Sequence, residues 1–330
     1  MNSGGPLNAA QTQALESMRI EFRGKEDPED TSFPLDDSCL LRYLVARNFD
    51  VKKAALMLQN TLKWRQDFGV KHIHTNAFMN VVAKENSTGK IYLRGYDEAG
   101  HIIMYMRPKF ENTNDHDGNL KHLVYNLERA IACMKQRHAE SKSSEMPQEK
   151  LALLVDYDGY SLFNAPPMRT SNATLDILQN HYPERLWKAY CIRPPWIFSG
   201  FWKMISPFID VKTKTKIVMV GGGYSLSDIC AELTRDSAGS LTASALEKDL
   251  GGEVGFLTQP SAAIDCKNGK GEPMDGQSTF SCARYLGLCE SGCAGAAADD
   301  GGGNDASINQ RARKAFPFDY NFLQGDEWQR

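Results

Sequence analysis

Two short stretches of this 330-residue chain contain residue types that bind phosphate or metal ions in other proteins. Gly221-Gly222-Gly223 follow an apolar run, as the glycines of a phosphate-binding loop do. However, GGGYSLSD lacks the GxGxxG spacing and comes after the last expected strand, so we interpret it as a chain reversal. His72 and His74 could share a metal ion, but no cysteine or carboxylate is spaced to complete the site. We therefore expect a surface loop there, and neither a metal nor a cofactor.

Two carboxylates lie where a catalytic group is often found. Asp156 and Asp158 end a strand-like run, a position at which α/β enzymes place functional residues. Asp158 also precedes a glycine, and Asp-Gly is ordinary turn chemistry. The chain contains neither a GxSxG nor an HExxH motif, and no nucleophile stands beside a base. The sequence therefore predicts a protein that is not an enzyme.

The densest group of large apolar residues follows Pro194-Pro195, which end one strand and start a helix. The group consists of Trp196, Ile197, Phe198, Phe201, Trp202 and Ile205. Trp196 and Phe198 are about 200° apart around a helix, so the aromatic rings cannot all face inward. We predict that Phe198 and Phe201 face an interior and that Trp196 or Trp202 is at least partly exposed. The segment is either an ordinary sheet-covering helix or a movable wall over an apolar cavity that touches a membrane.

Composition excludes several classes of function. The net charge of −3 gives no general attraction to nucleic acid, and no apolar run approaches the ~20 residues that span a bilayer. The first residues resemble neither a secretory signal nor a myristoylation site. Four cysteines lie singly among apolar residues, and four lie in a Gly/Ala-rich tail with a CESGC spacing that suits neither zinc nor a disulfide framework. We expect a cytoplasmic protein.

The elements that must position these residues follow from periodicity. Apolar stripes over 7–22, 40–47 and 51–68 predict three helices. Asp36-Asp37-Ser38 offer first-turn and capping residues to the second helix, Asp50 can cap the third, and Gly69 closes it. Five strand-like runs follow in the order KIYLR, IIMYMR, KLALLVDY, WKAYCI and KIVMV. The first two form a hairpin, helical patterns separate the others, and KIVMV is typical of a strand buried on both sides. The predicted fold is α/β, with an N-terminal helical subdomain and a mixed, mostly parallel five-stranded sheet covered by helices.

Several blocks of this sequence, in order, resemble one family. LLRYLVARNFDVKKAALMLQNTLKWR is similar to the N-terminal helical motif of the CRAL-TRIO lipid-binding proteins. MRPKFENT, KHLVYNLERA, LVDYDGYSLFNAPPM and the region 181–220 resemble the phosphatidylinositol-transfer branch. The resemblance implies an extension over 1–35, a helical domain over 36–75 and a lipid-binding domain over 84–255. It also implies an apolar lipid cavity closed by the helix at 196–205, which acts as its gate. Residues 261–330 are low in complexity, and we expect them to be disordered.

The resemblance also implies a set of residues that bind the lipid headgroup: Arg47, Glu184, Thr213 and Lys216. Arginine and lysine donate hydrogen bonds to a phosphodiester, and a carboxylate accepts them from an inositol ring. Two positions depart from the family pattern. Asn48 replaces a lysine that many members have, and Leu127 stands where a tyrosine that holds phosphatidylcholine is expected. We therefore expect phosphatidylinositol in preference to phosphatidylcholine.

The expected function is the transfer of a single phospholipid, most simply phosphatidylinositol, between membranes. The partners would be that lipid and, transiently, a membrane surface, with the protein a monomer that binds no nucleic acid. We expect the protein in the cytoplasm, associated peripherally with membranes. Two alternatives remain open: a carrier or sensor of another hydrophobic ligand such as a sterol or an isoprenoid, and a scaffold that presents lipid without net transfer.

Overall fold

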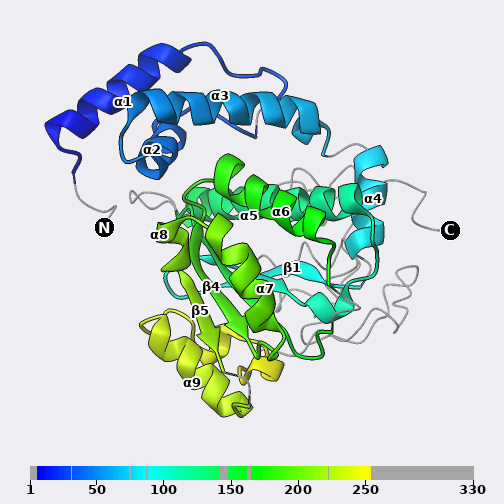
Figure 1. Cartoon of the computed structure of the whole chain (residues 1–330). Coiled ribbons are helices and arrows are strands. Elements are labelled where there is room, and N and C mark those ends of the chain that lie inside the picture. Colours follow the sequence, from blue (N-terminus) through cyan, green and yellow to red (C-terminus); the bar gives the residue numbers. More distant parts are fainter. Residues whose placement is uncertain are drawn as a thin grey trace, which may run out of the picture. The chain divides into compact units, whose positions relative to one another are not determined.

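The structure is a computed structural model that describes residues 6–30, 32–73, 76–86, 88–141, 148–161, 165–221 and 223–253 (Figure 1). His74, Gly222 and the predicted tail 261–330 lie outside the described residues. The chain divides into two compact units. One comprises Met1–Ile73 with Thr174–Arg185, and the other comprises His74–Ala173 with Leu186–Arg330.

The first unit is helical, as the sequence predicts. It contains α1 (Ala9–Phe22), α2 (Asp37–Ala46), α3 (Val51–Phe68) and the 3-10 turn Val70–His72. Asp36 accepts a hydrogen bond from the backbone N–H of Cys39, and Asp50 accepts one from Lys53, so each caps the helix that follows it. Gly69 ends α3 with a φ of 78°, a left-handed conformation that glycine adopts without strain. The predicted cap Asp50 and the stop at Gly69 are confirmed, and of the three candidates at positions 36–38 it is Asp36 that caps α2.

The segment Thr174–Arg185 completes this unit. Around this segment the helix is not regular, because α6 (Met168–Asp176) gives way to a π-helical turn, Ile177–His181. That turn packs against α3, where the His181 and Trp64 rings are stacked with centroids 4.2 Å apart. It also contacts α2, because the Tyr43 hydroxyl donates to the His181 carbonyl at 3.3 Å. A stretch from the middle of the chain is therefore held by the N-terminal helices.

The second unit is built on a five-stranded sheet in the order β1-β2-β3-β4-β5. The strands are β1 (Ile91–Tyr96), β2 (Ile102–Met106), β3 (Leu151–Asp156), β4 (Leu186–Ile192) and β5 (Ile217–Val220). The helices are α4 (Asn76–Asn86), α5 (His116–Ser141), the first part of α6, α7 (Phe198–Ile205), α8 (Val211–Lys214) and α9 (Leu226–Asp236), with short 3-10 turns at Pro108–Phe110, Ser206–Phe208, Ala243–Ala245 and Lys248–Leu250. β1 and β2 are antiparallel and every later pair is parallel. The predicted mixed sheet is confirmed.

One strand differs from its prediction. KIVMV was expected to be buried on both faces of the sheet, but Ile217 and Val218 of β5 are only half-buried. Val220 is fully buried, whereas 41% of Met219 is exposed. β5 is also the edge strand of the sheet, since it pairs only with β4, and a hydrophobic run alone does not reveal that position.

A C-terminal strap, residues 237–253, closes the described part of this unit. Its Leu241, Leu246 and Leu250 are fully buried, and so is Glu247. Gly251 has a φ of 82°, and a Cβ atom there would lie 2.0 Å from the carbonyl oxygen of Leu226. Only glycine allows the strap to pass this close to α9.

Candidate functional site

The segment that the sequence singled out forms α7, which begins at Phe198, after a turn that contains Trp196. Phe198 and Ile205 are buried, Phe201 and Trp202 are half-buried, and 87% of Trp196 is exposed. The prediction that one of the two tryptophans faces solvent is confirmed for Trp196. The helix was expected over 196–205 but begins only at Phe198, because residues 196 and 197 form a turn after the two prolines.

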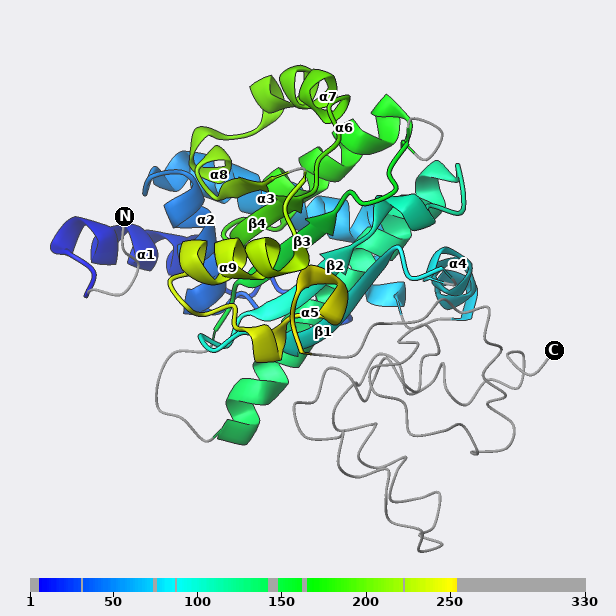
Figure 2. The same cartoon turned by 90° about the horizontal axis from the view of Figure 1, so that it is seen from below.

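One aromatic contact joins the inner side of α7 to the end of β3, and two others lie within the helix. The Phe198 ring lies 4.6 Å from that of Tyr157, which directly follows β3, and it also contacts the rings of Phe201 and Trp202. In Figure 2 the α7 ribbon lies at the periphery of the second unit, well away from α5. The helix therefore presents an aromatic face inward while its other side is open.

Exposed apolar and basic side chains recur along the chain from the start of this segment into α8. Its apolar members are Trp196, Met204, Phe208 and Val211, with exposed fractions of 87%, 51%, 64% and 74%. Lys203 and Lys212 are exposed among them. We call these six residues the apolar–basic strip.

The predicted headgroup residues divide between the two units. In the first unit, Arg47 ends α2 and is half-buried, with its Nη2 3.5 Å from the Asn180 side-chain oxygen. Glu184 follows the π-helical turn and has a φ of 57°, which is unusual for a residue with a side chain. The structure thus brings the arginine and the chain segment that carries the glutamate into the same unit.

The other two headgroup residues lie in the second unit. Asp210 caps α8 by accepting hydrogen bonds from the backbone N–H groups of Lys212 and Thr213. The Lys216 N–H donates to the Thr213 carbonyl at 3.0 Å, and its ammonium group donates to the Leu186 carbonyl, also at 3.0 Å. Thr213 and Lys216 are both half-buried, at the entrance to β5.

The strand-end aspartates are both engaged in ion pairs. Asp156 is buried and receives two hydrogen bonds from the Arg193 guanidinium, at 3.1 and 2.6 Å. Asp158 pairs with the Lys109 ammonium at 3.1 Å, and this lysine lowers the pKa of the Asp158 carboxyl. Each carboxylate is paired with a basic side chain, which is the arrangement expected of residues that stabilise the turn after β3.

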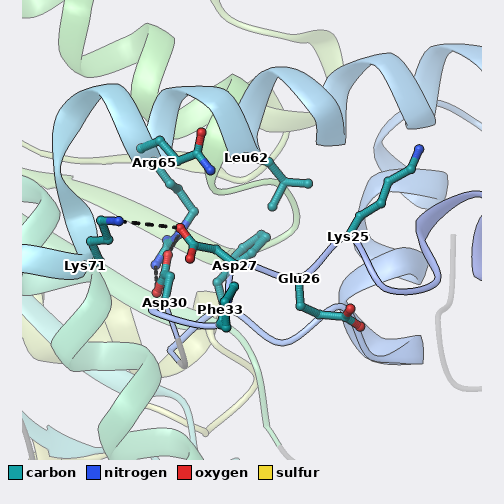
Figure 3. A pocket seen from close by; sticks show the side chains of 10 residues that line it. Lys25, Glu26, Asp27, Asp30, Phe33, Leu62, Arg65 and Lys71 are labelled. Carbon is teal, nitrogen blue, oxygen red and sulfur yellow. Dashed lines mark hydrogen bonds and ion pairs between the residues drawn. The ribbon is translucent and has the colours of Figure 1, made fainter.

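A pocket of about 190 Å³ lies in the first unit (Figure 3). Its walls include the buried Arg65, which pairs with Asp30 at 2.6 Å and lies over the Phe33 ring. Lys71 at its edge pairs with Glu29. Ligand pockets usually enclose roughly 300–1,000 Å³ with mostly apolar walls. This small, charged pocket does not suit acyl chains.

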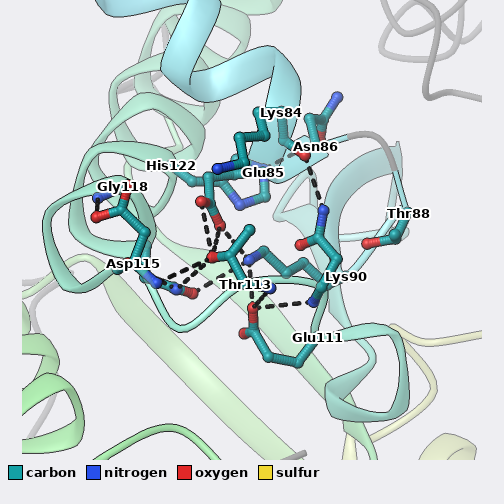
Figure 4. Close-up of polar contacts among 12 residues, drawn as sticks. Lys84, Glu85, Asn86, Thr88, Lys90, Glu111, Thr113, Asp115, Gly118 and His122 are labelled. Atoms are coloured by element: carbon teal, nitrogen blue, oxygen red, sulfur yellow. Dashed lines mark hydrogen bonds and ion pairs between the residues drawn. The ribbon is translucent and has the colours of Figure 1, made fainter.

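A buried polar network in the second unit was missed by sequence reasoning (Figure 4). The Lys90 ammonium pairs with Glu85 and lies 2.6 Å from Glu111, and Thr113 donates to Glu85 at 2.8 Å. Glu111 and Thr113 belong to the MRPKFENT block, so part of that motif connects the residues after β2 to α4 and the start of β1. Nothing in the local pattern signals this network, because Lys90 and Glu111 are 21 positions apart.

Two further features bear on the site. The described residues hold no group of His, Cys, Asp and Glu side chains placed to bind a metal ion. Among the described helices, none combines the length and apolarity that crossing a bilayer requires.

The comparisons with known proteins agree with this architecture. The family model for the CRAL/TRIO domain matches residues 86–238, and the model for the CRAL/TRIO N-terminal domain matches residues 13–60. The SEC14 cytosolic factor of Kluyveromyces lactis is 30% identical over 265 residues, which cover 76% of this chain and 81% of that protein. This chain belongs to the CRAL-TRIO family.

Two other matches extend the comparison. The phosphatidylinositol transfer protein PDR17 of Saccharomyces cerevisiae is 34% identical over 56% of this chain and 53% of its own length. The chain spans about half or less of the first curated relatives it matches. The crystal structure of Sfh5 superposes with a TM-score of 0.51 at 17% identity, covering 70% of this chain and 84% of that one, and supports the CRAL-TRIO fold.

Proposed function

We propose that this CRAL-TRIO protein binds one phospholipid, phosphatidylinositol, and transfers it between membranes without covalent chemistry. The observation that carries the proposal is the two-sided character of the α7 segment. Phe198 and Ile205 are buried on its inner side, while Trp196 and Met204 are exposed on its outer side. A segment that is apolar on both sides suits a wall between a lipid and a membrane.

The physical chemistry of a lipid in water explains why such a wall is needed. Each acyl CH₂ group that is shielded from water contributes about 0.8 kcal/mol, so spontaneous desorption of a phospholipid is slow. A carrier must enclose the chains and open only where they can leave without contacting water. In our proposal α7 is the gate, and it opens at the membrane surface.

In our proposal, contact between the apolar–basic strip and a membrane causes α7 to open. Indole rings favour the interfacial zone of a bilayer, which suits the exposed Trp196. Lysines near an anionic leaflet add roughly 1 kcal/mol each, which suits the exposed Lys203 and Lys212. The protein would therefore associate peripherally and briefly with membranes that contain anionic lipid, and otherwise stay in the cytoplasm as a monomer.

For the headgroup we propose the four residues predicted from the family pattern. Arg47 and Lys216 would donate hydrogen bonds to the phosphodiester, Glu184 would accept them from inositol hydroxyls, and Thr213 would bridge the two. The name of the PDR17 relative, a phosphatidylinositol transfer protein, supports this choice of lipid. Leu127 is buried where a phosphatidylcholine-binding tyrosine was expected, which favours phosphatidylinositol further.

Mass spectrometry of lipid that co-purifies with the protein tests the proposal. We expect one phosphatidylinositol per chain. A sterol or an isoprenoid in its place would identify a carrier of a different ligand. Bound phosphatidylinositol without transfer between vesicles would identify a lipid-presenting scaffold.

A further inference from the structure

An ion pair lies at the point where the chain leaves the sheet for α7. Arg193 follows β4, and its guanidinium donates from Nε to Asp156 Oδ1 at 3.1 Å and from Nη2 to Oδ2 at 2.6 Å. The Asp156 side chain is 2% exposed and that of Arg193 is 21% exposed. Bidentate guanidinium–carboxylate pairs with this geometry are strong and fix orientation as well as distance.

The backbone of Arg193 is in an unfavourable conformation. Its φ is 52°, in the left-handed region that residues other than glycine rarely adopt. Two interactions hold it there: the ion pair with Asp156, and a ladder hydrogen bond from the Arg193 N–H to the Val220 carbonyl at 2.9 Å. Strained residues persist only where the surrounding structure over-determines them, and they cluster at switch points.

The direction of the following segment depends on this residue. The two prolines after Arg193 have nearly fixed φ angles, so few backbone torsions besides the φ and ψ of Arg193 can redirect the chain before Trp196 and α7. The next contact with the end of β3 is the Phe198 ring against Tyr157. At the other end, the Asp210 cap of α8 and the hydrogen bond from the Lys216 ammonium to the Leu186 carbonyl hold the chain to β4 and β5.

We infer that Asp156 and Arg193 form a hinge pair that fixes the closed position of residues 194–209, so that loss of the pair lets this segment swing outward more often. The inference deepens the proposed function, on which it rests, by assigning the residues that set the opening of α7. Asp156 and Arg193 are positioning residues. Neither has to contact the lipid.

Hydrogen–deuterium exchange on the full-length protein tests the hinge pair directly. Asp156→Asn and Arg193→Gln should each raise amide exchange over residues 197–208 by about tenfold, the scale expected when a coupled charge pair is lost. Exchange in β3 and β4 should stay at the wild-type level. An equal loss of protection through those strands, or no change in any segment, would show an ordinary structural ion pair and overturn the inference.

Two further variants separate charge from backbone strain and from general effects. Arg193→Asn removes the pair but keeps a residue that tolerates positive φ. It should raise amide exchange over residues 197–208 as Arg193→Gln does. Wild-type exchange there would show that the backbone conformation at position 193, and not the ion pair, holds the segment. Glu232→Gln breaks an ion pair with Arg235 on α9, whose side chain is 73% exposed, and should leave exchange over residues 197–208 unchanged.

Lipid transfer between vesicles gives a second, independent measurement. The Asp156→Asn protein should transfer phosphatidylinositol several-fold faster than wild type if opening limits exchange. Because amide exchange requires no transfer, the two inferences can fail separately. A protein that transfers no lipid but still opens when the pair is broken would contradict the proposed function and support the hinge pair.

Discussion

A single buried histidine connects the stability of the helical unit to pH. The His181 ring is stacked on Trp64, and its Nδ1 lies 3.1 Å from the Thr61 hydroxyl. Burial lowers the pKa of the His181 imidazole to about 4, below the usual value of 6.5. The folded chain therefore keeps this ring neutral where the unfolded chain would protonate it.

The sign of the pH effect follows from proton linkage. Between about pH 6.5 and pH 4 the unfolded state binds more protons at His181 than the folded state does, so stability falls as the pH falls through this window. We expect the melting temperature of the wild-type protein to decrease across it and that of His181→Gln to decrease less. His72→Gln, at an exposed histidine of the same unit, should keep the wild-type profile. Identical profiles for His181→Gln and wild type would show that His181 contributes nothing to the effect.

Residue-level features divide into those that the sequence predicts and those that it does not. The caps Asp36 and Asp50 and the stop at Gly69 are local, because each acts on backbone groups within a few positions. The partners Asp156 and Arg193 are 37 positions apart, and one sequence alone does not pair them. The left-handed backbone of Arg193 was missed for the same reason, since tertiary contacts impose it.

At the scale of elements, α7 has two sides with different roles. Phe198→Ala should destabilise the fold by about 3–5 kcal/mol, because it removes a buried aromatic ring. Trp196→Ala should change stability by less than about 0.5 kcal/mol, because that ring is 87% exposed. Urea unfolding measures the change in the free energy of unfolding for both variants. The Trp196 variant should differ from wild type in membrane binding, with weaker binding to anionic vesicles in a sedimentation assay. If both substitutions destabilise equally, α7 is an ordinary core helix and not a gate.

The C-terminal strap depends on one buried carboxylate. Glu247 accepts hydrogen bonds from Arg94 at 2.7 Å, Arg107 at 2.5 Å and the Tyr92 hydroxyl at 2.9 Å, and its side chain is fully buried. Glu247→Gln leaves buried guanidinium charge without its full counter-charge and should cost about 3–5 kcal/mol in urea unfolding.

A matched control for this substitution lies on α9. Glu232 pairs with Arg235, whose side chain is 73% exposed, so Glu232→Gln should cost no more than about 1 kcal/mol. A similar small loss for Glu247→Gln would show that the strap is held by its leucines alone.

Elements were predicted where their pattern is local and strongly periodic. The three N-terminal helices, the hairpin and the parallel strands follow from spacing and from turn residues. The edge position of β5 and the π-helical turn at Ile177–His181 do not, because both depend on which elements pack nearby. The strap was also missed, since Glu247 and Arg94 are 153 positions apart.

At the scale of the whole molecule, the chain order does not match the division into units. Thr174–Arg185, between two elements of the sheet unit, belongs with the N-terminal helices. Arg47 and Glu184 therefore lie in one unit, and Thr213 and Lys216 lie in the other.

The measurement that tests the central claim most directly is phosphatidylinositol transfer between vesicles by a double variant, Glu184→Ala with Lys216→Ala. It removes one headgroup residue from each unit, and we expect transfer to be abolished while circular dichroism and thermal melting show a folded protein. Lys52→Ala with Glu98→Ala removes the same two charges from exposed positions and should transfer at the wild-type rate. Wild-type transfer by a folded Glu184/Lys216 variant would contradict the claim that these residues hold the lipid headgroup.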